Sequence, residues 1–455
     1  MISGVKFRAY PTMEQKVILS QWMGCARLIW NAKCDEDQYF RSFANKFYPF
    51  REYFATQDQK YSQFKSKELT PWLFDCPSTI LKNSTVNWFN TLKKSIKGTC
   101  GRPKRKVKTD KGNIYLTRDL FSFERDPFGK VRLKIGGKKY NIGFLAFKAH
   151  SDFKEPNSLY IRKERGQYFV SFCYEDGLDN PVFTPEEHLE HLRGMTAAQL
   201  QEIVVGLDRG ISIPVHSGDA EFDFSKAQKN HLSKADRYIK RLQRKLARQQ
   251  KGSNRRAKTK HRIATHHAKK ANIRADFAHK TSRSLVDSDK RVFVLEKLNT
   301  KQMTRRPVPK KDEDGHFIPN KAKAKAGLNK AILNVGWHQI ATFLKYKAAR
   351  LGKAVLSIPA AYTSQECASC GHIHPDNRKS QERFKCVSCE HIDNADHNAA
   401  IVIKSRAIKL ILDTGTVLSE DHLISDSGRR GSRKSVKGSA LNRIVDEASK
   451  EKCAA

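Results

Sequence analysis

Hydrophobic and polar residues alternate along two parts of the chain. In the opening stretch "VKFRAY", Val5, Phe7 and Ala9 fall on one face, while Lys6 and Arg8 fall on the other. The stretches "GKVRLKIGGKKYNIGFLAF" and "SLYIRKERGQYFVSFCYE" alternate in the same way around glycine-containing turns. A period of two predicts strands. We therefore expect a small antiparallel β barrel or sheet that the first strand rejoins.

A helical pattern separates the first strand from the others. From Met13 to about Lys97, aromatic residues recur among many lysines, namely Trp22, Trp30, Tyr39, Phe43, Phe54, Trp72 and Trp88. The segment 101–112, "GRPKRKVKTDKG", is basic and rich in helix breakers, which predicts a linker. The segment 177–200 is acidic and has little pattern, so we expect it to be a connector.

Apolar strands and long helical patterns make up the second half of the chain. The stretches "EIVVGLD", "RVFVLEKLN" and "KAVLSIPAAYTS" predict strands. Residues 226–286 predict a helical hairpin broken near Gly252, with an apolar stripe formed by Leu232, Ala235, Ile239, Leu242 and Leu246. The stretch "NKAILNVGWHQIATFLKYKAARLG" predicts a helix that stops at Gly352, with an apolar face formed by Leu333, Trp337, Ile340, Leu344, Ala348 and Leu351.

Two segments of the second half lack a regular pattern. The basic loop 300–328 carries Pro307, Pro309 and Pro319, and we expect it to be mobile. Residues 411–455 are rich in Ser, Gly, Arg and Lys. This composition predicts a disordered or loosely attached tail.

The balance of charge indicates a polyanionic partner. The 455 residues suffice for roughly two to four domains, and 86 Lys and Arg against 47 Asp and Glu give a net charge of +39. Lys226–Lys280 holds nineteen basic residues against Asp236 and Asp276, a net charge of +17. Like charges at that density repel one another unless an anion compensates them. Counterion release then favours a long or folded nucleic acid.

The chain has no apolar leader with a small-residue cleavage site and no run of about eighteen apolar residues. We therefore expect a soluble intracellular protein. In a reducing compartment, six of the ten cysteines are expected to be ordinary thiols because they are scattered singly. These six are Cys25, Cys34, Cys76, Cys100, Cys173 and Cys453.

The other four cysteines have the spacing of a zinc site. Cys367 and Cys370 form one CxxC pair, and fifteen residues later Cys386 and Cys389 form another. Two such turns present four thiolates to one tetrahedral ion, whereas a redox pair needs a single CxxC. We expect a structural zinc with no open position. His372, His374 and His391 are then surface residues or neighbours of the ligands.

Three acids lie at strand-related positions. Asp208 ends "IVVGLD", Glu296 follows "VFVL", and Asp396 opens the expected helix "DHNAAIVIKS". Carboxylates from neighbouring strand ends can hold two Mg²⁺ ions for hydrolysis of a phosphodiester. Each acid alone also fits a turn or cap, and Asp396 fits a simple helix N-cap. Asp393 either shares the site or caps a turn.

The same residues carry a family resemblance. The stretches "VVGLDRGI", "VFVLEKLN" and "DNADHNAAIVI" resemble the three RuvC-type motifs of the transposon-encoded TnpB proteins and of the type V CRISPR effectors descended from them. "WHQIATFLKYKAARLGKAVLSIPAAYTSQECASCG" resembles the helix, strand and zinc entry of that family, and "VKFRAYPTMEQK" resembles its opening. The resemblance covers roughly residues 1–410, with a less typical tail. No second Cys/His cluster occurs near the N-terminus, which favours the transposon kind.

The resemblance implies a multidomain α+β architecture. An N-terminal β-barrel wedge domain with an inserted helical recognition domain precedes an RNase H-like (RuvC) α/β nuclease domain with an inserted zinc ribbon. The expected boundaries are 1–12 plus 101–200 for the wedge domain, 13–100 for the recognition domain, 201–362 plus 393–410 for the nuclease domain, 363–392 for the zinc ribbon and 411–455 for the tail.

The resemblance also implies the roles of residues and partners. Asp208, Glu296 and Asp396 would be the catalytic acids and magnesium ligands, and the four cysteines the zinc ligands. A guide RNA and a double-stranded DNA target would be the partners, with protein reading a short flanking motif. We expect a monomer in the cytoplasm of a prokaryotic cell, associated with the nucleoid. Glu390 stands where the family commonly has Gly, so we expect a less regular second zinc turn with all four ligands intact.

Three functions remain open at this point. The first is an RNA-guided, Mg²⁺-dependent DNA endonuclease that cuts both strands in turn at one site. The second is a guided DNA-binding protein or repressor with an idle nuclease site. The third is a transposase that acts without RNA. The basic hairpin would lie against RNA or heteroduplex, and Trp72, Trp88 or Tyr39 would either stack on bases or pack in a core.

Overall fold

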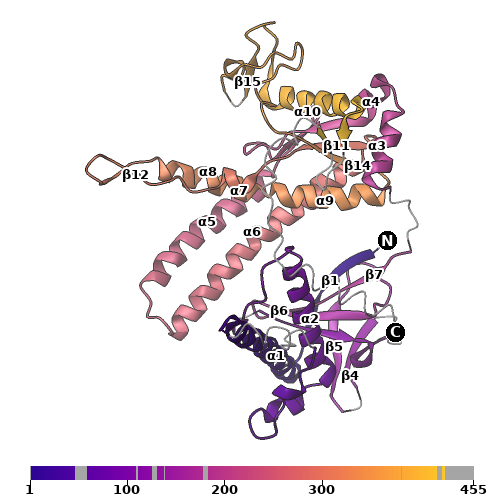
Figure 1. Ribbon diagram of the computed structural model, residues 1–455, viewed down its shortest axis with the longest axis vertical. Coiled ribbons are helices and arrows are strands. Elements are labelled where there is room, and N and C mark those ends of the chain that lie inside the picture. The colour runs from indigo at the N-terminus through magenta and orange to yellow at the C-terminus, as the bar shows by residue number, and fades with distance from the viewer. Residues whose placement is uncertain are drawn as a thin grey trace. The chain divides into compact units, whose positions relative to one another are not determined.

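The computed structural model describes residues 2–46, 59–108, 111–125, 131–137, 139–177, 183–380, 382–417 and 423–425. The chain forms two compact units (Figure 1). One comprises residues 1–179 with 246–265, and the other comprises 180–245 with 266–455. Within the described ranges, no helix is both long and apolar enough to cross a membrane.

A seven-stranded antiparallel sheet forms the centre of the first unit. β1 (Ile2–Tyr10) pairs with β5 and β7, which confirms that the first strand rejoins the later ones. The order is β2-β6-β7-β1-β5-β4-β3. The other strands are β2 (Gly112–Thr117), β3 (Phe121–Arg125), β4 (Val131–Gly136), β5 (Asn141–Lys148), β6 (Ser158–Glu164) and β7 (Gln167–Glu175).

The two edge strands of this sheet are close in sequence. Only the short helix η4 (Arg118–Leu120) separates β2 from β3, so the sheet curls to bring its edges together. The described residues of β2 and β3 do not pair with each other. The expected barrel is therefore a curled sheet without a closing ladder.

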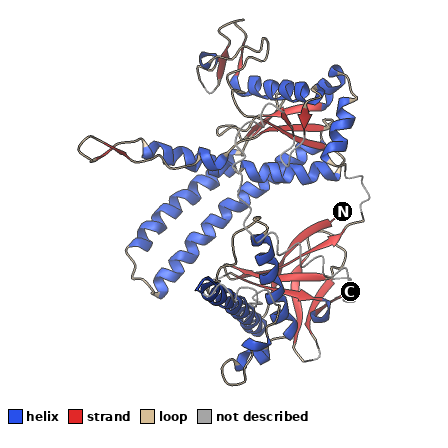
Figure 2. Cartoon of the chain, viewed as in Figure 1, coloured by secondary structure: helices blue, strands red, loops and turns tan. Residues whose placement is uncertain are grey.

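The helices of the first unit share its core with the sheet (Figure 2). They are α1 (Met13–Lys46), η2 (Ser62–Phe64), η3 (Pro71–Asp75) and α2 (Ser78–Ile96). Trp22 and Leu81 pack with the sheet residue Phe7 in one apolar cluster, so residues 13–100 do not form a separate core. Phe54 lies outside the described residues.

Three parallel strands form the centre of the second unit. β8 (Val204–Leu207), β11 (Val292–Glu296) and β14 (Ala354–Ile358) pair in the order β14-β11-β8. An antiparallel bridge between Asp208 and His216 joins β8 to β9 (Val215–His216), which pairs with β10 (Glu221–Phe222). The result is a mixed sheet, β10-β9-β8-β11-β14. The chain is thus a multidomain α+β protein.

Helices cover both faces of the parallel strands (Figure 2). Val292 and Val294 face α10 (Ala395–Leu412), α3 (Pro185–Arg193) and α4 (Ala197–Ile203). Phe293 and Leu295 face α6 (Asn254–Asp287) and α9 (Trp337–Arg350). Leu200 of the expected connector is fully buried in this core. The boundary between the units therefore lies near residue 180, not at residue 200 as expected.

Two helix breaks occur at glycines whose backbone has the left-handed conformation. α5 (Lys226–Ala247) and α6 are separated near Gly252, with φ of 88°, as predicted. The single helix expected over residues 329–352 is wrong, because Gly336, with φ of 85°, ends α8 (Ala322–Val335) and starts α9. Leu333 of α8 is exposed while Trp337 of α9 is buried, so the apolar face does not continue across the break. Leu351, the C-cap of α9, is exposed as well.

Two segments expected to be irregular contain structure. The expected mobile loop 300–328 holds α7 (Thr300–Met303), the hairpin β12 (Lys310–Lys311) and β13 (Phe317–Ile318), and the start of α8. The expected tail starts too early, because Ile411 is fully buried in α10. β17 (Thr416–Val417) pairs with β18 (Ile424–Ser425), and residues 426–455 lie outside the described residues.

Candidate functional site

The three predicted acids come from three adjoining elements. Asp208 directly follows β8, and Glu296 is the last residue of β11. These strands are parallel neighbours, so their carboxyl ends meet at the same edge of the sheet. Asp396 is the second residue of α10, which packs on the same strands. The fold therefore brings acids that are far apart in sequence to one place.

Gly206 allows helix α10 to approach the sheet closely. A Cβ at Gly206 would lie 2.1 Å from the Ala400 carbonyl oxygen and 2.7 Å from the Lys404 amide nitrogen. Any side chain at this position would push α10 away. Because Gly206 lies two residues before Asp208, this contact sets the separation between Asp208 and Asp396.

Burial raises the pKa of two of the acids, Asp208 and Glu296. Glu296 is 7% exposed and Asp396 is 6% exposed. Burial, followed by the Glu296 and Asp396 carboxylates, raises the pKa of Asp208 to about 7. Burial also raises the pKa of Glu296, although the Thr363 hydroxyl opposes this shift. Such a site gains stability when a cation compensates its charge.

Side chains that the sequence did not single out hold the acids in place. Arg378 Nη2 donates to Asp396 Oδ1 at 3.1 Å. The Thr363 hydroxyl donates to the Glu296 carboxylate, and Arg209 donates to the Glu296 carbonyl. No sequence signal marks Arg378 in a chain this basic. The position of Arg209, directly after Asp208, was the one local hint.

The acids supply the kind of oxygen ligand that a divalent cation binds. Carboxylate oxygens are suitable Mg²⁺ ligands. Among the described residues, the groups of three or more possible ligands whose atoms lie within 4.8 Å of one another are the four cysteines and the exposed set Asp312, Asp314 and His316. The three acids do not form such a group.

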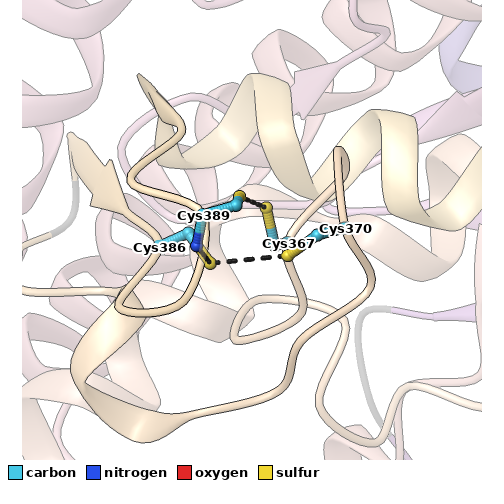
Figure 3. Close-up of side chains that lie close together, drawn as sticks. All are labelled: Cys367, Cys370, Cys386 and Cys389. Atoms are coloured by element: carbon cyan, nitrogen blue, oxygen red, sulfur yellow. Dashed lines mark hydrogen bonds between the residues drawn. The ribbon is translucent and has the colours of Figure 1, made fainter.

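The four predicted cysteines come together (Figure 3). Cys367 Sγ lies 3.6 Å from Cys389 Sγ, and Cys370 Sγ lies 3.6 Å from Cys386 Sγ. Tetrahedral ligands with zinc–sulfur bonds of about 2.3 Å have sulfurs roughly 3.8 Å apart. The sulfurs are too far apart for disulfide bonds of about 2.05 Å. The group could therefore hold a zinc ion.

Both zinc turns have the same form. Cys367 N donates to the His372 carbonyl at 3.0 Å, and Cys386 N donates to the His391 carbonyl at 2.9 Å. Gly371, after the first pair, has φ of 76°, and Glu390, after the second, has φ of 59°. The expected irregularity at Glu390 is not observed, because this residue adopts the left-handed conformation itself.

The stretch "DHNAA" has a separate contact at each polar position. His397 Nδ1 lies 2.6 Å from Asp393 Oδ2, so Asp393 is paired with histidine. The N-cap of α10 is Asn394, which accepts from the amides of Asp396 and His397. The simple N-cap interpretation of Asp396 is therefore wrong.

Asn398 joins the zinc site to helix α10. Its Nδ2 donates to the Glu366 carbonyl at 2.8 Å, and its Oδ1 accepts from Ala368 N at 2.9 Å. Arg406 Nε, farther along α10, donates to Glu366 Oε2 at 2.6 Å. The first cysteine turn is thus fixed to the helix that carries Asp396. The rings of His372 and His374 are stacked, with their centroids 6.1 Å apart.

The aromatic candidates for stacking on bases fall into two groups. Trp88 is fully buried with Trp30 in a cluster between α1 and α2. Trp72 is 44% exposed and Tyr39 is 65% exposed. Trp88 therefore packs in a core, whereas the other two remain accessible.

Three family models match parts of the chain. Residues 337–403 match "Cas12f1-like, TNB domain", and residues 173–306 match "Probable transposase". Residues 1–33 match "Helix-turn-helix domain", although they form β1 and the first part of α1 in this chain. The match to the TNB domain ends at residue 403, within α10.

The chain also resembles individual proteins. It is 26% identical over 404 residues to the "Putative RNA-guided DNA endonuclease InsQ" of Escherichia coli (strain K12), covering 88% of this chain and 90% of that protein. It is 49% identical over 55 residues to the "CRISPR-associated endodeoxyribonuclease Cas12f1" of Sulfoacidibacillus thermotolerans, covering 12% and 13%. A solved structure of the "mini-RNA-guided endonuclease CRISPR-Cas_phi3" is 11% identical, with coverage of 90% and 93% and a TM-score of 0.47. The family matches, taken with the long match to InsQ, support the resemblance of the chain to the TnpB family.

Proposed function

We propose that this protein is an RNA-guided DNA endonuclease. It cleaves double-stranded DNA beside a short flanking motif with a single RuvC-type, two-metal site. The observation that carries the proposal is the convergence of Asp208, Glu296 and Asp396, where burial and mutual repulsion raise the pKa of Asp208 to about 7. The names of the relatives, InsQ and Cas12f1, support guided DNA cleavage.

The chemistry depends on oxygen ligands held in fixed positions. Mg²⁺ ions, when bound, supply an activated water and neutralise charge on the scissile phosphate. Asp208, Glu296 and Asp396 would hold these ions. The Thr363 hydroxyl orients the Glu296 carboxylate, and Arg378 keeps Asp396 in place while adding a positive charge beside the acids.

The partners follow from charge and from the relatives. The net charge of +39 suits a large polyanion. Hairpin α5–α6 would lie along the guide RNA or its heteroduplex with DNA. Zinc at the four cysteines would do no chemistry, because all four positions are filled by protein. Zinc would instead keep the first cysteine turn in position. Asn398 connects that turn to helix α10, so zinc would also help to position the helix.

A transposase that acts without RNA is the second candidate. The match of residues 173–306 to "Probable transposase" favours it. The same acids can serve strand transfer or hydrolysis, so the acidic site does not separate the two functions. RNA bound to the purified protein does.

The test begins with the full chain expressed beside its native flanking DNA. RNA that copurifies is sequenced, and the complex is incubated with a plasmid that matches the RNA, with Mg²⁺ or with a chelator. We expect discrete cuts that need Mg²⁺ and disappear in Asp208→Ala. Asp219→Ala is the matched control, because Asp219 is an exposed acid near β10 that the proposed site does not use.

Each outcome leads to a different function. Bound RNA with no cleavage of any matching DNA would indicate a guided binding protein or repressor. Absence of RNA, together with strand joining, would favour the transposase. Cleavage that survives Asp208→Ala would overturn the assignment of the site.

A further inference from the structure

A second site lies in the first unit, apart from the acids. A cavity of ≈390 Å³ lies among α1, α2, β2 and the segment 105–107. Its lining combines basic residues, amides and aromatic rings, including Arg27, Trp30, Asn87, Arg105, Tyr115 and Tyr160. Its volume falls in the range of about 300–1,000 Å³ that is usual for small-ligand sites.

One wall of the cavity is a segment fastened to helix α1. Asn31 makes two hydrogen bonds with the backbone of Lys106, at 3.0 Å and 2.7 Å. Trp30 Nε1 donates to the Lys104 carbonyl at 2.9 Å, and the Lys106 ammonium lies 3.5 Å from the Trp30 ring centroid. Arg105 pairs with Asp35. The wall is therefore preformed.

Another part of the lining presents aromatic rings. Tyr115 of β2 and Tyr160 of β6 are direct cross-strand partners, and their ring centroids lie 4.8 Å apart. Both tyrosines are partly exposed. The ring planes are tilted by 50° to each other, so each ring by itself offers a flat face on which a base can stack.

Two polar side chains of the lining lack protein partners. Within the described part of the chain, the Arg27 guanidinium forms no ion pair or hydrogen bond, and the Asn87 amide forms no hydrogen bond. Both residues are half-buried, so a ligand can bind them with limited competition from water. The side-chain amide of Asn83, one turn before Asn87, donates a hydrogen bond to the Tyr115 carbonyl at 3.4 Å.

We propose that this cavity binds a single unpaired nucleotide of a bound nucleic acid. The base stacks on Tyr115 or Tyr160 and hydrogen-bonds to Asn87, while Arg27 holds the phosphate. The rings, the amide and the cation are what recognition of a splayed-out base requires. The nucleotide comes from the guide RNA or from the DNA target, and the two sources share this chemistry. The inference rests on the proposed function, because the nucleotide belongs to the guided complex, but it requires binding and no cleavage.

Photocrosslinking in the complete complex tests this site. The full chain carrying Asp208→Ala, which keeps DNA intact, is assembled with its RNA and matching DNA. In one arm the RNA contains 4-thiouridine and 6-thioguanosine, and in the other the DNA contains the corresponding thio-bases. Crosslinked peptides are identified by mass spectrometry. We expect crosslinks at Tyr115 or Tyr160 in one arm, which identifies the source.

Matched variants separate the cavity from general binding. Arg27→Gln and Asn87→Leu are expected to lower the crosslink yield at Tyr115 and Tyr160 at least fivefold relative to crosslinks elsewhere in the chain. Asn90→Leu changes an exposed amide on the same helix and is expected to have no effect. Circular dichroism checks folding, and Arg27→Gln carries the test if Asn87→Leu does not fold.

The result that overturns the proposal is equally specific. Crosslinks along the chain with none at Tyr115 or Tyr160 in either arm would exclude a nucleotide in this cavity. An equal loss in Asn90→Leu would do the same. Guided cleavage by the chain with intact Asp208 is measured separately, so it can persist when the cavity proposal fails.

Discussion

The Asp208 carboxyl titrates near neutral pH, because burial and the neighbouring carboxylates raise its pKa to about 7. A divalent cation binds the ionised form, so protons and metal compete. We expect the Mg²⁺ concentration for half-maximal cleavage to rise about tenfold for each pH unit below about 7, and to be flat above about 8. Single-turnover cleavage rates measured against Mg²⁺ concentration from pH 5.5 to 8.5 check this.

The same pKa predicts a stability effect without metal. Between the ordinary Asp value of 3.8 and about 7, the folded protein binds more protons at Asp208 than the unfolded chain does, so this carboxyl lowers stability as pH rises. Asp208→Asn should therefore raise the melting temperature more at pH 8 than at pH 4. An equal gain at both values would show that charge at Asp208 is not the cause.

Glu390 has the backbone conformation of a glycine. Its φ of 59° is strained for a residue with a Cβ, at a cost of roughly 1 kcal/mol. We expect Glu390→Gly to slow zinc release to a chelator about fivefold, since 1.36 kcal/mol corresponds to a factor of ten. Gly371→Ala, at the matching position with φ of 76°, should speed release by a similar factor. Similar release rates in both variants would contradict this account.

Local spacing made several of these residues predictable. The zinc cysteines repeat a CxxC spacing, and Asp208 and Glu296 end apolar strands. Arg378 and Thr363 were not predictable, because each contacts an acid at least 18 residues away in sequence, and only the folded chain places them together.

Among the elements, the contact between β8 and α10 controls the acidic site. Gly206→Ala would place a Cβ 2.1 Å from the Ala400 carbonyl oxygen, which forces the helix outward. We expect a loss of roughly 2 kcal/mol in unfolding free energy and at least a tenfold loss of cleavage rate. Chemical denaturation and single-turnover cleavage measure the two effects.

Gly24→Ala is the control for this substitution. Gly24 lies in α1, and a Cβ there meets no atom within 4 Å. Alanine in an open helical position stabilises by up to about 1 kcal/mol, so this variant should retain or gain stability. If Gly206→Ala behaves like Gly24→Ala, the helix is not held by this contact.

Element types followed from hydrophobic period, but element boundaries did not always do so. The alternating strands and the basic hairpin are confirmed. The break at Gly336 was missed because the 3.6-residue pattern continues through it, and a glycine alone does not require a positive φ. Residues 177–200 were read as a connector, yet Leu189 and Leu200 pack in the core of the second unit.

At the scale of the whole molecule, the proposed binding of nucleic acid is expected to depend on charge. The following basic residues of the hairpin are exposed and form no ion pair within the described ranges: Arg241, Lys245, Lys258 and Arg262. Changing all four to Gln should reduce the slope of log affinity against log salt concentration by roughly two to four. Binding isotherms at several salt concentrations measure this slope.

Basic residues of α6 that form ion pairs provide the comparison. Lys280 and Arg283 bind Asp276 and Asp287 at 3.0 Å and 2.7 Å. Changing both to Gln should alter the slope less per charge removed, because these charges are already partly compensated. Equal changes per charge would mean that the hairpin acts only through net charge.

The sequence by itself predicted the alternating strands, the basic hairpin, the four cysteines, the three acids and a polyanionic partner. All of these depend on residue type and short-range spacing, which a chain carries before it folds. The tertiary structure decided which side chains hold the acids, where the two units divide, and that Tyr115, Tyr160, Arg27 and Asn87 line one cavity. These features depend on contacts between distant segments, and such contacts exist only after the chain has packed.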